Sequence, residues 1–502
     1  MSNNPMLRSL HQMLRSVVSE ELLSQIEPLN VQAITLDSRC VTSGGLFVAL
    51  GGANTDGRLY IDAAIEKGAV AVLCELDNGR GAYVELSHST PIIYIPNLAL
   101  RLSHIASEFY QHPQNEMVLI GITGTNGKTT VTQLICQWLE KLGHTTYSMG
   151  TLGNGLTGQL VESPNTTLNA IDLMANLANA KQLGAQYVVM EVSSHGIELG
   201  RVDALTFDIS AFTNLSQDHL DFHGNMESYA DAKKQLFSAK FSKQAVLNGN
   251  DNIAFAWAQD WHYENPLSSY NQKLPHANDF VLANDVIYST DGISAVIDAS
   301  FGQGQLNAKL LGQFNLDNLL CAINVLCLAG FELAQVLKIA PSLASIPGRM
   351  EVFQHGNSPT VVVDYAHTPD ALTQTIKALR RHCQGKLSVL FGCGGDRDNS
   401  KRPLMAQAAS ANADSLIVTQ DNSRSEPFEQ ILTHIMTGFT TTENIIIEEN
   451  RAKAVKLAVS NAKFGDIVLL AGKGHENYQI IGNQCLDYDE RALAKSLVEA
   501  YL

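Results

Sequence analysis

The sequence predicts an α/β protein of three domains whose central domain is a parallel sheet of the mononucleotide-binding type. Three observations indicate this fold. A chain of 502 residues is long enough for about three domains. Short apolar runs alternate with segments of helical periodicity, which is the pattern of a doubly wound parallel sheet. The loop "GTNGKTT" lies between one such run and a helical segment, as phosphate-binding loops do.

Domain boundaries are predicted where Pro and Gly interrupt these patterns. Residues 1–113 would form a small N-terminal α/β domain, and residues 114–346 would form the central domain with the phosphate loop. Residues 347–502, which begin with "PGRMEVF", would form a C-terminal Rossmann-like α/β domain.

The first domain is predicted to contain three strands and a helix, over residues 33–36, 46–50, 69–73 and 60–67. Asp37, Ser38 and Arg39 follow directly on the first of these strands. They could form a polar turn, or a site for a polar ligand to which Arg39 presents a planar pair of donors. Spacing alone leaves both interpretations open.

The phosphate loop is flanked by an apolar run and by a helical apolar face, namely residues 117–122 and Val131, Leu134, Ile135, Trp138, Leu139 and Leu142. Gly124 and Gly127 would let backbone N–H groups point at an anion. Lys128 would then reach phosphate oxygens, and the Thr129 hydroxyl can bind Mg²⁺. The loop is a variant of the strict G-x-x-x-x-G-K-[ST] pattern, because Ile122 stands where the first glycine should be.

Two further strands, over 187–190 and 208–212, are followed by groups that can bind a metal ion. Glu191 follows the first, and "DHLDFHG" with His219 comes after the second. Because parallel strands present their carboxyl ends at one edge of the sheet, both side chains could reach the same Mg²⁺ as Thr129. Helix caps or solvated residues are the alternative.

Lys233 falls on the apolar face of the helix predicted in "MESYADAKKQLFS", whereas Lys234 points away. The other residues of this face are Tyr229, Ala232, Leu236 and Phe237. A buried, unpaired ammonium is costly. The side chain would therefore either reach solvent or form an ion pair, or it would be carbamylated by CO₂ and become an anionic metal ligand.

Two asparagines open a strongly apolar helix in "GQFNLDNLLCAINVLCLAG". Asn315 suits the N-cap and Asn318 the first turn. A contact with a nucleotide base is the functional alternative.

The C-terminal domain repeats one arrangement four times, a strand followed by a polar loop. The loops contain Asp364, His367, Arg397, Asn422, Arg424, Lys473, His475 and Glu476. Four such loops at one edge of a parallel sheet predict a second binding face.

The composition argues against several classes of protein. A net charge of −16 argues against a nucleic-acid-binding surface. The cysteines form no C-x-x-C pair, and no apolar run approaches the length of a membrane span. We therefore expect a cytoplasmic protein that neither inserts into membranes nor binds nucleic acid, with a monomer as the simplest state.

Nine motifs occur in a fixed order along the chain: "GTNGKTT", "EVSSHG", "DHLDFHG", "YADAKKQLF", "GQFNLDN", "PGRME", "DYAHTPD", "GCGGDRD" and "GKGHE". Together they resemble the Mur ligase family over nearly the whole chain. The resemblance implies an ATP-dependent enzyme that uses Mg²⁺ to join an amine to a carboxylate through an acyl phosphate. With "TLDSR" near the N-terminus, it implies UDP-N-acetylmuramoyl-L-alanyl-D-glutamate as the carboxylate substrate.

The resemblance also assigns roles to individual residues. ATP would contact Gly124, Thr125, Asn126, Gly127, Lys128, Thr129, Thr130, Asn318, Arg349 and Asp364. The metal ligands would be Thr129, Glu191, His219 and carbamylated Lys233, and the catalytic groups Lys128, Glu191, His219 and Lys233. The UDP substrate would contact Ser38, Thr166, Thr167, Ser193 and Arg201. The amino acid would contact Arg397, Asp421, Asn422, Arg424, Gly472 and Glu476.

The loop "DNSR" implies that the amine is meso-diaminopimelate, since Arg424 can bind its second carboxylate through two hydrogen bonds and L-lysine has no such group. Glu476 could accept the distal ammonium. Two residues depart from the family pattern. Ser423 stands where relatives have proline, which would make the loop less rigid, and Leu199 replaces a polar substrate contact of some relatives.

Three other functions are alternatives to this one. The same ligation with L-lysine differs only in the amine. A ligase resembling folylpolyglutamate synthase would share the phosphate loop, but "TLDSR" and "DNSR" favour the muramoyl substrate. A nucleotide-dependent switch would hydrolyse nucleotide without needing an amine, and the set Lys128, Glu191, His219 and Lys233 argues against it.

Overall fold

The computed structural model describes residues 7–52, 55–76, 80–163, 165–289, 292–441, 443 and 445–501. The chain divides into two compact units. The first runs as far as Phe280 and includes Asn324–Ala329, and the second contains Val281–Ile323 and the chain from Gly330 onward. The domain boundaries predicted after residues 113 and 346 stay predictions, whereas the α/β class is confirmed by the sheets of both units.

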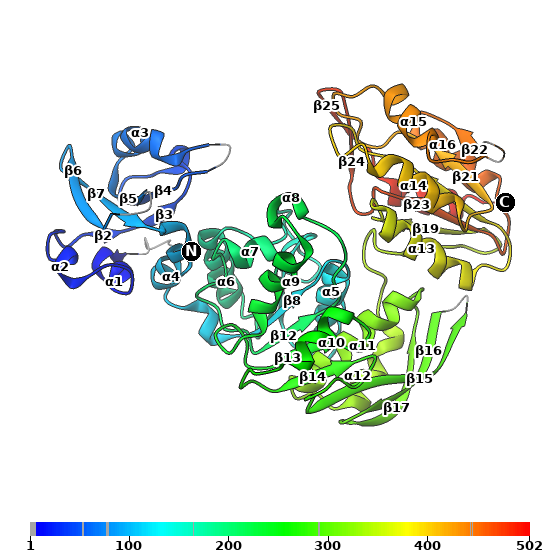
Figure 1. Ribbon diagram of the computed structural model, residues 1–502, viewed down its shortest axis with the longest axis horizontal. Helices are drawn as coiled ribbons and strands as arrows, with labels where there is room; N and C mark the ends of the chain where they lie inside the picture. Colours follow the sequence, from blue (N-terminus) through cyan, green and yellow to red (C-terminus); the bar gives the residue numbers. More distant parts are fainter. Residues whose placement is uncertain are drawn as a thin grey trace. The chain divides into compact units, whose positions relative to one another are not determined.

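The first unit begins with a five-stranded sheet in the order β3-β4-β5-β7-β6, drawn in blue in Figure 1. Its strands are β3 (Ala33–Thr35), β4 (Gly45–Ala49), β5 (Ala69–Leu76), β6 (Tyr83–Ser87) and β7 (Thr90–Pro96). The helices are α1 (Leu10–Leu14), α2 (Glu20–Leu23), α3 (Ile61–Glu66) and α4 (Leu98–Tyr110), and β1 (Arg8–Ser9) pairs with β2 (Asn30–Val31). The predicted strands and helix of this region are confirmed to within a few residues at their ends.

The phosphate loop follows β8, a strand of the second sheet of the first unit. In this unit the strands of that sheet run in the order β10-β9-β11-β8-β12-β13-β14. They are β8 (Val118–Thr123), β9 (Thr146–Gly150), β10 (Gly153–Leu156), β11 (Tyr187–Glu191), β12 (Ile209–Phe212), β13 (Ala245–Asn248) and β14 (Leu267–Tyr270). The helices are α5 (Lys128–Lys141), α6 (Ala170–Gln182), α7 (Ser194–Glu198), α8 (Leu220–His223), α9 (Met226–Lys234) and α10 (Asn252–Gln259). All these strand pairs except β9 with β10 are parallel, so the loops after β8, β11 and β12 meet at one edge.

The apolar face predicted for α5 is buried against this sheet. Val131, Leu134, Ile135, Trp138 and Leu139 have no exposed surface. Burial of aliphatic and aromatic side chains at this spacing fixes the rotation of the helix, so its N-terminus is held at the end of β8.

The parallel pattern predicted as far as residue 346 is wrong for residues 279–308. There β15 (Asp279–Ser289), β16 (Gly292–Ala299) and β17 (Gly302–Ala308) pair antiparallel. The connection from Ala299 to Gly302 is too short for a crossover helix, which a parallel pair requires. Two helices follow, α11 (Gln313–Leu328) and α12 (Leu333–Ile339).

The second unit also contains a six-stranded sheet in the order β18-β19-β23-β20-β21-β22. The strands are β18 (Glu351–Phe353), β19 (Thr360–Asp364), β20 (Leu387–Phe391), β21 (Ser415–Val418), β22 (Ile445–Ile447) and β23 (Ile467–Ala471), followed by the hairpin β24 (Tyr478–Ile481) and β25 (Gln484–Asp487). The helices are α13 (Pro369–His382), α14 (Lys401–Ser410), α15 (Phe428–Met436), α16 (Arg451–Ser460) and α17 (Glu490–Glu499).

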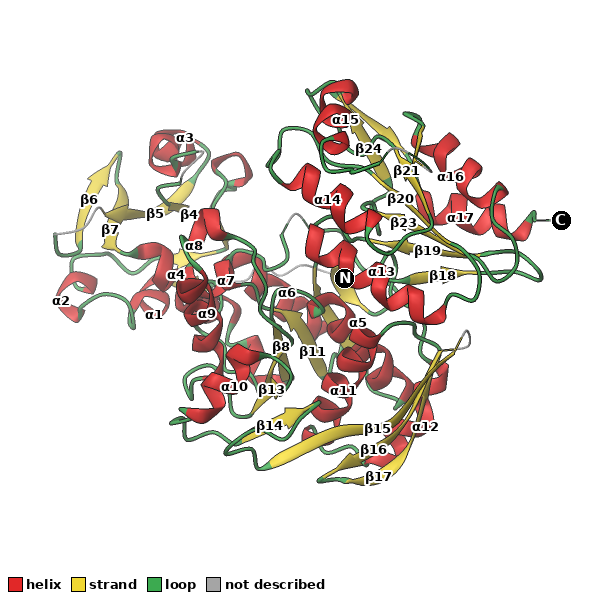
Figure 2. Cartoon of the chain, turned by 45° about the vertical axis from the view of Figure 1, so that its right-hand side comes forward, coloured by secondary structure: helices red, strands yellow, loops and turns green. Residues whose placement is uncertain are grey.

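Helices cover both faces of this sheet (Figure 2). Val362 packs with α13, α14 and α15 on one face, while its neighbours Val361 and Val363 pack with α16 and α17 on the other. The alternation follows from the two-residue period of a strand and explains why these strands are apolar throughout. Within the described ranges, no helix is both long enough and apolar enough to cross a membrane.

Candidate functional site

The loop from Gly124 to Thr130 joins β8 to the N-terminus of α5. Gly127 precedes α5 with a φ of 85°, and Gly124 has a φ of 142°, a region that favours glycine. A Cβ at Gly124 would overlap the Thr213 hydroxyl. The loop backbone is held from β12, because the Thr125 N–H donates to the Asn214 carbonyl at 2.8 Å and the Asn126 N–H donates to Asn214 Oδ1 at 3.0 Å. The predicted phosphate loop therefore lies at the N-terminus of α5, where the first N–H groups of a helix are available to an anion.

Two lysines approach this loop. Lys128 Nζ donates to the carbonyls of Gly124 and Thr125, at 2.8 and 2.9 Å. Lys233 is 1% exposed, and its Nζ donates to the Gly124 carbonyl at 3.0 Å. Neither solvent access nor an ion pair, the two ordinary outcomes predicted for Lys233, is found among the described residues.

The surroundings of Lys233 are aromatic and cationic. Its Nζ lies 4.5 Å from the centre of the Tyr229 ring, and the Tyr229 hydroxyl lies 3.2 Å from Thr125 Oγ1. Burial raises the pKa of Tyr229 to about 12, so the phenol stays neutral. Burial and the nearby Lys128 ammonium lower the pKa of the Lys233 amine well below its ordinary value.

Glu191 is the last residue of β11 and is buried beside the phosphate loop. The Thr129 hydroxyl donates to Glu191 Oε2 at 2.9 Å, so two of the predicted metal ligands are in contact. Thr151 binds both oxygens of the same carboxylate, through its N–H at 2.9 Å and its hydroxyl at 3.1 Å. Thr151 is not among the residues predicted from the sequence. It directly follows β9, which pairs in parallel with β11, so a polar residue at this strand end could have indicated the contact.

Four of the five residues predicted to contact the UDP substrate surround Glu191. Thr166 Oγ1 lies 3.1 Å from Thr151 Oγ1, and the Thr167 hydroxyl donates to the Glu191 carbonyl at 2.9 Å. The Ser193 N–H donates to Thr167 Oγ1 at 2.9 Å, and Arg201 Nη1 donates to the Thr167 carbonyl at 2.7 Å.

The fifth predicted residue, Ser38, lies instead at the edge of the five-stranded sheet, in a 3₁₀ turn capped by Asp37. The Arg39 guanidinium binds the Asp37 carboxylate, with Nη2 at 2.8 Å from Oδ2. The polar-turn interpretation of this segment therefore describes its local geometry.

His219 is the remaining predicted metal ligand. It lies between β12 and α8 with a φ of 52°, its Nε2 is 3.4 Å from Asp218 Oδ2, and its ring centre is 6.1 Å from that of Tyr229. In the described part of the chain, no three His, Cys, Asp or Glu side chains converge as a metal cage. Mg²⁺ does not need one, because it usually takes one or two carboxylates together with water and phosphate oxygens. The Thr129 hydroxyl and the Glu191 carboxylate fit that chemistry.

The three nucleotide contacts predicted outside the phosphate loop lie in the second unit. Asn318 is buried and its Nδ2 donates to Asn315 Oδ1 at 3.2 Å. The prediction that Asn315 is the N-cap is wrong. Helix α11 begins at Gln313, so Asn315 already lies within its first turn. The Arg349 guanidinium lies 4.5 Å from the centre of the Tyr365 ring.

Asp364 is the last residue of β19, and its carboxylate accepts hydrogen bonds from neighbouring segments of the same domain. Its Oδ2 accepts the Met350 N–H at 2.8 Å, and its Oδ1 accepts the Ala366 N–H at 3.0 Å and the Thr375 hydroxyl at 3.2 Å. Burial raises its pKa despite these bonds. Its carboxylate therefore joins the start of the sheet to α13.

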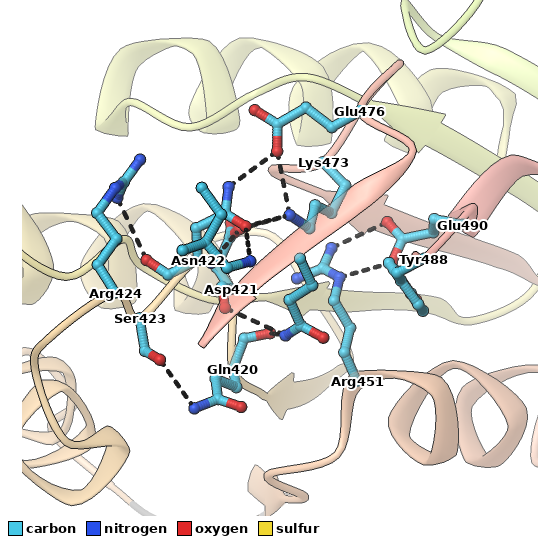
Figure 3. Close-up of polar contacts among 12 residues, drawn as sticks. Gln420, Asp421, Asn422, Ser423, Arg424, Arg451, Lys473, Glu476, Tyr488 and Glu490 are labelled. Atoms are coloured by element: carbon cyan, nitrogen blue, oxygen red, sulfur yellow. Dashed lines mark hydrogen bonds and ion pairs between the residues drawn. The ribbon is translucent and has the colours of Figure 1, made fainter. Parts of the chain in front are cut away.

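The predicted amino-acid residues after β21 and β23 form one buried polar cluster (Figure 3). Lys473 Nζ donates to Asn422 Oδ1 at 2.6 Å and to Glu476 Oε2 at 3.0 Å, and lies 3.5 Å from Asp421 Oδ1. Asn422 Nδ2 donates to Glu476 Oε2 at 2.9 Å. Gly472 has a φ of 113°, and a Cβ there would crowd the Asp421 carboxylate.

Arg424 and Arg397 flank Gly394 at the next loop of the sheet edge. Arg424 Nη1 donates to the carbonyls of Gly395 and Asn422, at 3.0 and 3.2 Å, and its backbone has a φ of 50°. Arg397 is exposed and lines a cavity of about 700 Å³ whose other lining residues are Asp396, Asp398, Asn399, Ser425, Glu426, Pro427 and Gln430.

The hairpin that follows β23 holds the "DNSR" loop. The Ile480 N–H donates to Asn422 Oδ1 at 2.9 Å, and the Arg424 N–H donates to the Ile480 carbonyl at 3.1 Å. Ser423, which replaces the proline of relatives, is buried and its Oγ accepts a hydrogen bond from Gln420 at 3.1 Å. The loop is thus fixed by hydrogen bonds that do not require proline.

Three family models match the chain. The model described as the catalytic domain of the Mur ligase family matches residues 30–110, the Mur ligase middle domain matches residues 122–326, and the glutamate ligase domain of Mur ligases matches residues 348–474.

Individual proteins are similar over nearly the whole chain. The UDP-N-acetylmuramoyl-L-alanyl-D-glutamate--2,6-diaminopimelate ligase of Haemophilus influenzae is 44% identical over 475 residues, which cover 94% of this chain and 97% of the relative. A solved structure of a ligase of that name is 35% identical, with a TM-score of 0.69, and covers 96% of this chain and 99% of its own. Folylpolyglutamate synthase of Mycobacterium tuberculosis shares the fold, with a TM-score of 0.59 at 17% identity over 74% of this chain and 92% of its own.

The fold and the loop after β8 define a phosphate-loop α/β protein with a further sheet whose strand ends carry polar loops. The family models and the 44% identical relative narrow this class. The chain belongs to the Mur ligase family.

Proposed function

We propose that the protein is the ATP-dependent ligase that adds meso-diaminopimelate to UDP-N-acetylmuramoyl-L-alanyl-D-glutamate, a step in making peptidoglycan precursors. The observation that carries this proposal is the near full-length similarity to a ligase with that printed name. The arrangement of Arg424, Asn422 and Glu476 supports the choice of amine.

The reaction has two steps. An oxygen of the terminal carboxylate of the UDP substrate attacks the γ-phosphorus of ATP, so an acyl phosphate forms and ADP leaves. The amine nitrogen then attacks the acyl carbon, the C–O bond to phosphate breaks, and an amide, inorganic phosphate and a proton are released. Phosphorylation is needed because a free carboxylate is a poor acyl donor.

The phosphate loop would hold ATP in the first step. The backbone N–H groups at the start of α5 would face the phosphates, and Lys128 would turn from its two loop carbonyls to a phosphate oxygen. Mg²⁺, when bound, would offset phosphate charge, and Thr129 and Glu191 are the groups that would hold it. His219 is proposed as a further ligand, and Asn318, Arg349 and Asp364 as nucleotide contacts.

Carbamylated Lys233 is part of the same proposal. Its amine is buried next to a carbonyl, an aromatic ring and the repelling Lys128 ammonium. Addition of CO₂ to the neutral amine forms an N–C bond, releases a proton and converts the group into an anion, which Lys128 attracts. The change of charge would relieve the repulsion and provide an oxygen ligand for a metal ion.

The UDP substrate would lie along Thr166, Thr167, Ser193 and Arg201, with Ser38 contacting it from the five-stranded sheet. Thr166, Thr167, Ser193 and Arg201 lie around Glu191, so the substrate carboxylate would arrive near the phosphate loop. Leu199, where some relatives have a polar residue, would leave that one contact unmade.

The amine would be recognised by opposite charges at its distal end. Arg424 and Arg397 would bind the second carboxylate of diaminopimelate, and Glu476 its ammonium, with Asn422, Asp421 and Gly472 shaping the site. L-lysine has no second carboxylate and would leave the guanidinium groups unpaired. We further propose that the enzyme works in the cytoplasm as a monomer, which light scattering at micromolar concentration would check.

The test is release of phosphate from ATP in the presence of UDP-N-acetylmuramoyl-L-alanyl-D-glutamate and Mg²⁺, with meso-diaminopimelate, L-lysine or no amine. Release that depends on diaminopimelate is expected. Release with lysine at an equal rate would keep the ligase and reject the assignment of Arg424. Release without amine would instead indicate a nucleotide-dependent switch.

A further inference from the structure

Lys473 is the most completely enclosed charged group near the proposed amino-acid site. It follows β23, lies between Gly472 and Gly474, and is 0% exposed. Its polar partners among the described residues are Asn422, Glu476 and Asp421. All three belong to the proposed amino-acid site, in which Lys473 itself has no proposed contact with the substrate.

Lys473 and the Ile480 N–H together determine which way the Asn422 amide faces. An ammonium is only a donor, so the atom of Asn422 that lies 2.6 Å from Nζ must be the oxygen. The same oxygen accepts the Ile480 N–H at 2.9 Å. The amide nitrogen is therefore directed to Glu476, to which it donates at 2.9 Å.

Lys473 also fixes the Glu476 carboxylate. Oε2 accepts from both Lys473 and Asn422, whereas the other oxygen points away from these two side chains (Figure 3). Oε2 is therefore held in place, and the other oxygen is directed away from Lys473 and Asn422, where it can meet a ligand. A carboxylate anchored in this way loses less conformational freedom when it meets a cation than a mobile one would.

The charges in the cluster point to the same role. Asp421 and Glu476 contribute two negative charges and Lys473 one positive charge, while the charge of Arg451, which also acts on Asp421, is balanced by Glu490. The cluster therefore keeps one excess negative charge for an incoming ammonium. Without Lys473, two carboxylates would face each other in a buried site, which is unfavourable unless one takes up a proton.

We infer that Lys473 is a positioning residue for the amine substrate: it orients Asn422 and Glu476 so that Glu476 presents one oxygen to the distal ammonium. This inference rests on the proposed function. Lys473 acts through its two neighbours and is not expected to touch the substrate.

The test compares KM and kcat for wild type, Lys473→Met and Lys473→Arg. Loss of the charged hydrogen bonds in Lys473→Met should raise KM for diaminopimelate by roughly tenfold or more. The KM values for ATP and the UDP substrate should stay within about twofold. Lys473→Arg keeps the charge and the donors, and should restore KM for diaminopimelate to within a few-fold of wild type.

A matched control is Arg451→Met. Arg451 is another buried cation of this domain, but it binds Glu490, with Nε at 2.6 Å and Nη2 at 2.9 Å, and the Ala471 carbonyl at 2.9 Å. Its loss should lower the melting temperature without a selective rise in KM for diaminopimelate. A similar selective rise would show that general loosening of the domain is sufficient, and would overturn the inference.

A second background guards against misfolding of Lys473→Met. The double variant Asp421→Asn/Lys473→Met has the same net charge as wild type. Its KM for diaminopimelate should still be about tenfold higher than that of Asp421→Asn alone. If Lys473→Met leaves KM for diaminopimelate unchanged in either background, the inference is overturned. The proposed function would still stand in that case, provided that the wild type is active. A wild type without diaminopimelate-dependent release would overturn both.

Discussion

Two lysines, Lys233 in the first unit and Lys473 in the second, are almost fully buried, and their surroundings are opposite. Lys233 lies against a carbonyl, the Tyr229 ring and another ammonium. Lys473 lies between two carboxylates and an amide oxygen. The same residue type is thus placed once where positive charge is disfavoured and once where it is required.

The difference shows what each lysine can do. A buried amine that is readily neutral is nucleophilic, and can react with CO₂. A buried ammonium held by carboxylates is unreactive and acts through its charge and its three donors. Lys233 is therefore suited to covalent modification, and Lys473 to orienting neighbouring side chains.

The largest expected effect is that of Lys233→Ala. Removal of the group that would be carbamylated should lower kcat on the order of a hundredfold with any amine, because the proposed metal ligand is lost. Short carboxylic acids such as acetate should restore part of the activity by occupying the vacated space. Phosphate release, with and without added acetate, is the measurement.

Lys234→Ala is the matched control for this prediction. Lys234 is the next residue of α9 but is only partly buried, and its loss should leave kcat nearly unchanged. Equal activity of Lys233→Ala and wild type would reject carbamylation, and the contrast between the two lysines would then concern stability alone.

Sequence patterns predicted much of this contrast, because burial follows from periodicity. The helical spacing of Tyr229, Ala232 and Phe237 placed Lys233 on a buried face, and all four are buried. The partner could not be predicted, since Gly124 is 109 residues away and contributes a backbone oxygen, which no side-chain pattern reveals. The strand-end rule similarly indicated the loops with Asn422 and Lys473, but not the hydrogen bonds within the cluster.

Local competition explains the predictions that were wrong or missing. Asn315 has the side chain of an N-cap, but the Gly312 carbonyl already accepts the N–H groups of Asn315 and Leu316, so the helix starts earlier. Thr151 follows a strand in a glycine-rich segment and resembles a turn residue. Its contact with Glu191 depends on strand order, which periodicity does not give.

Arg424→Ala should have the next largest effect and tests the "DNSR" loop of the second unit. Loss of a charged hydrogen bond to the second carboxylate should weaken the use of diaminopimelate by about 1.5–3 kcal/mol, with little change for L-lysine. The ratio of kcat/KM for the two amines is the measurement. Arg380→Ala is the control, because Arg380 pairs with Asp414 at 2.9 Å in the same domain. An equal loss for both amines would contradict the role of Arg424 in selecting the amine.

The smallest expected effect concerns the pH dependence of stability around Lys473. Burial alone would raise the pKa of Asp421, but Arg451 and Lys473 outweigh it and lower the pKa below its ordinary value. A carboxyl with a lowered pKa stabilises the fold above its unfolded pKa, near 4, and loses this contribution as the pH falls through the folded pKa. Asp421→Asn should therefore flatten the fall in melting temperature between pH 5 and pH 3 by about a few degrees. Parallel curves for the variant and wild type would show that the cluster does not hold Asp421 ionised, and the charge balance argued for Lys473 would have to be abandoned.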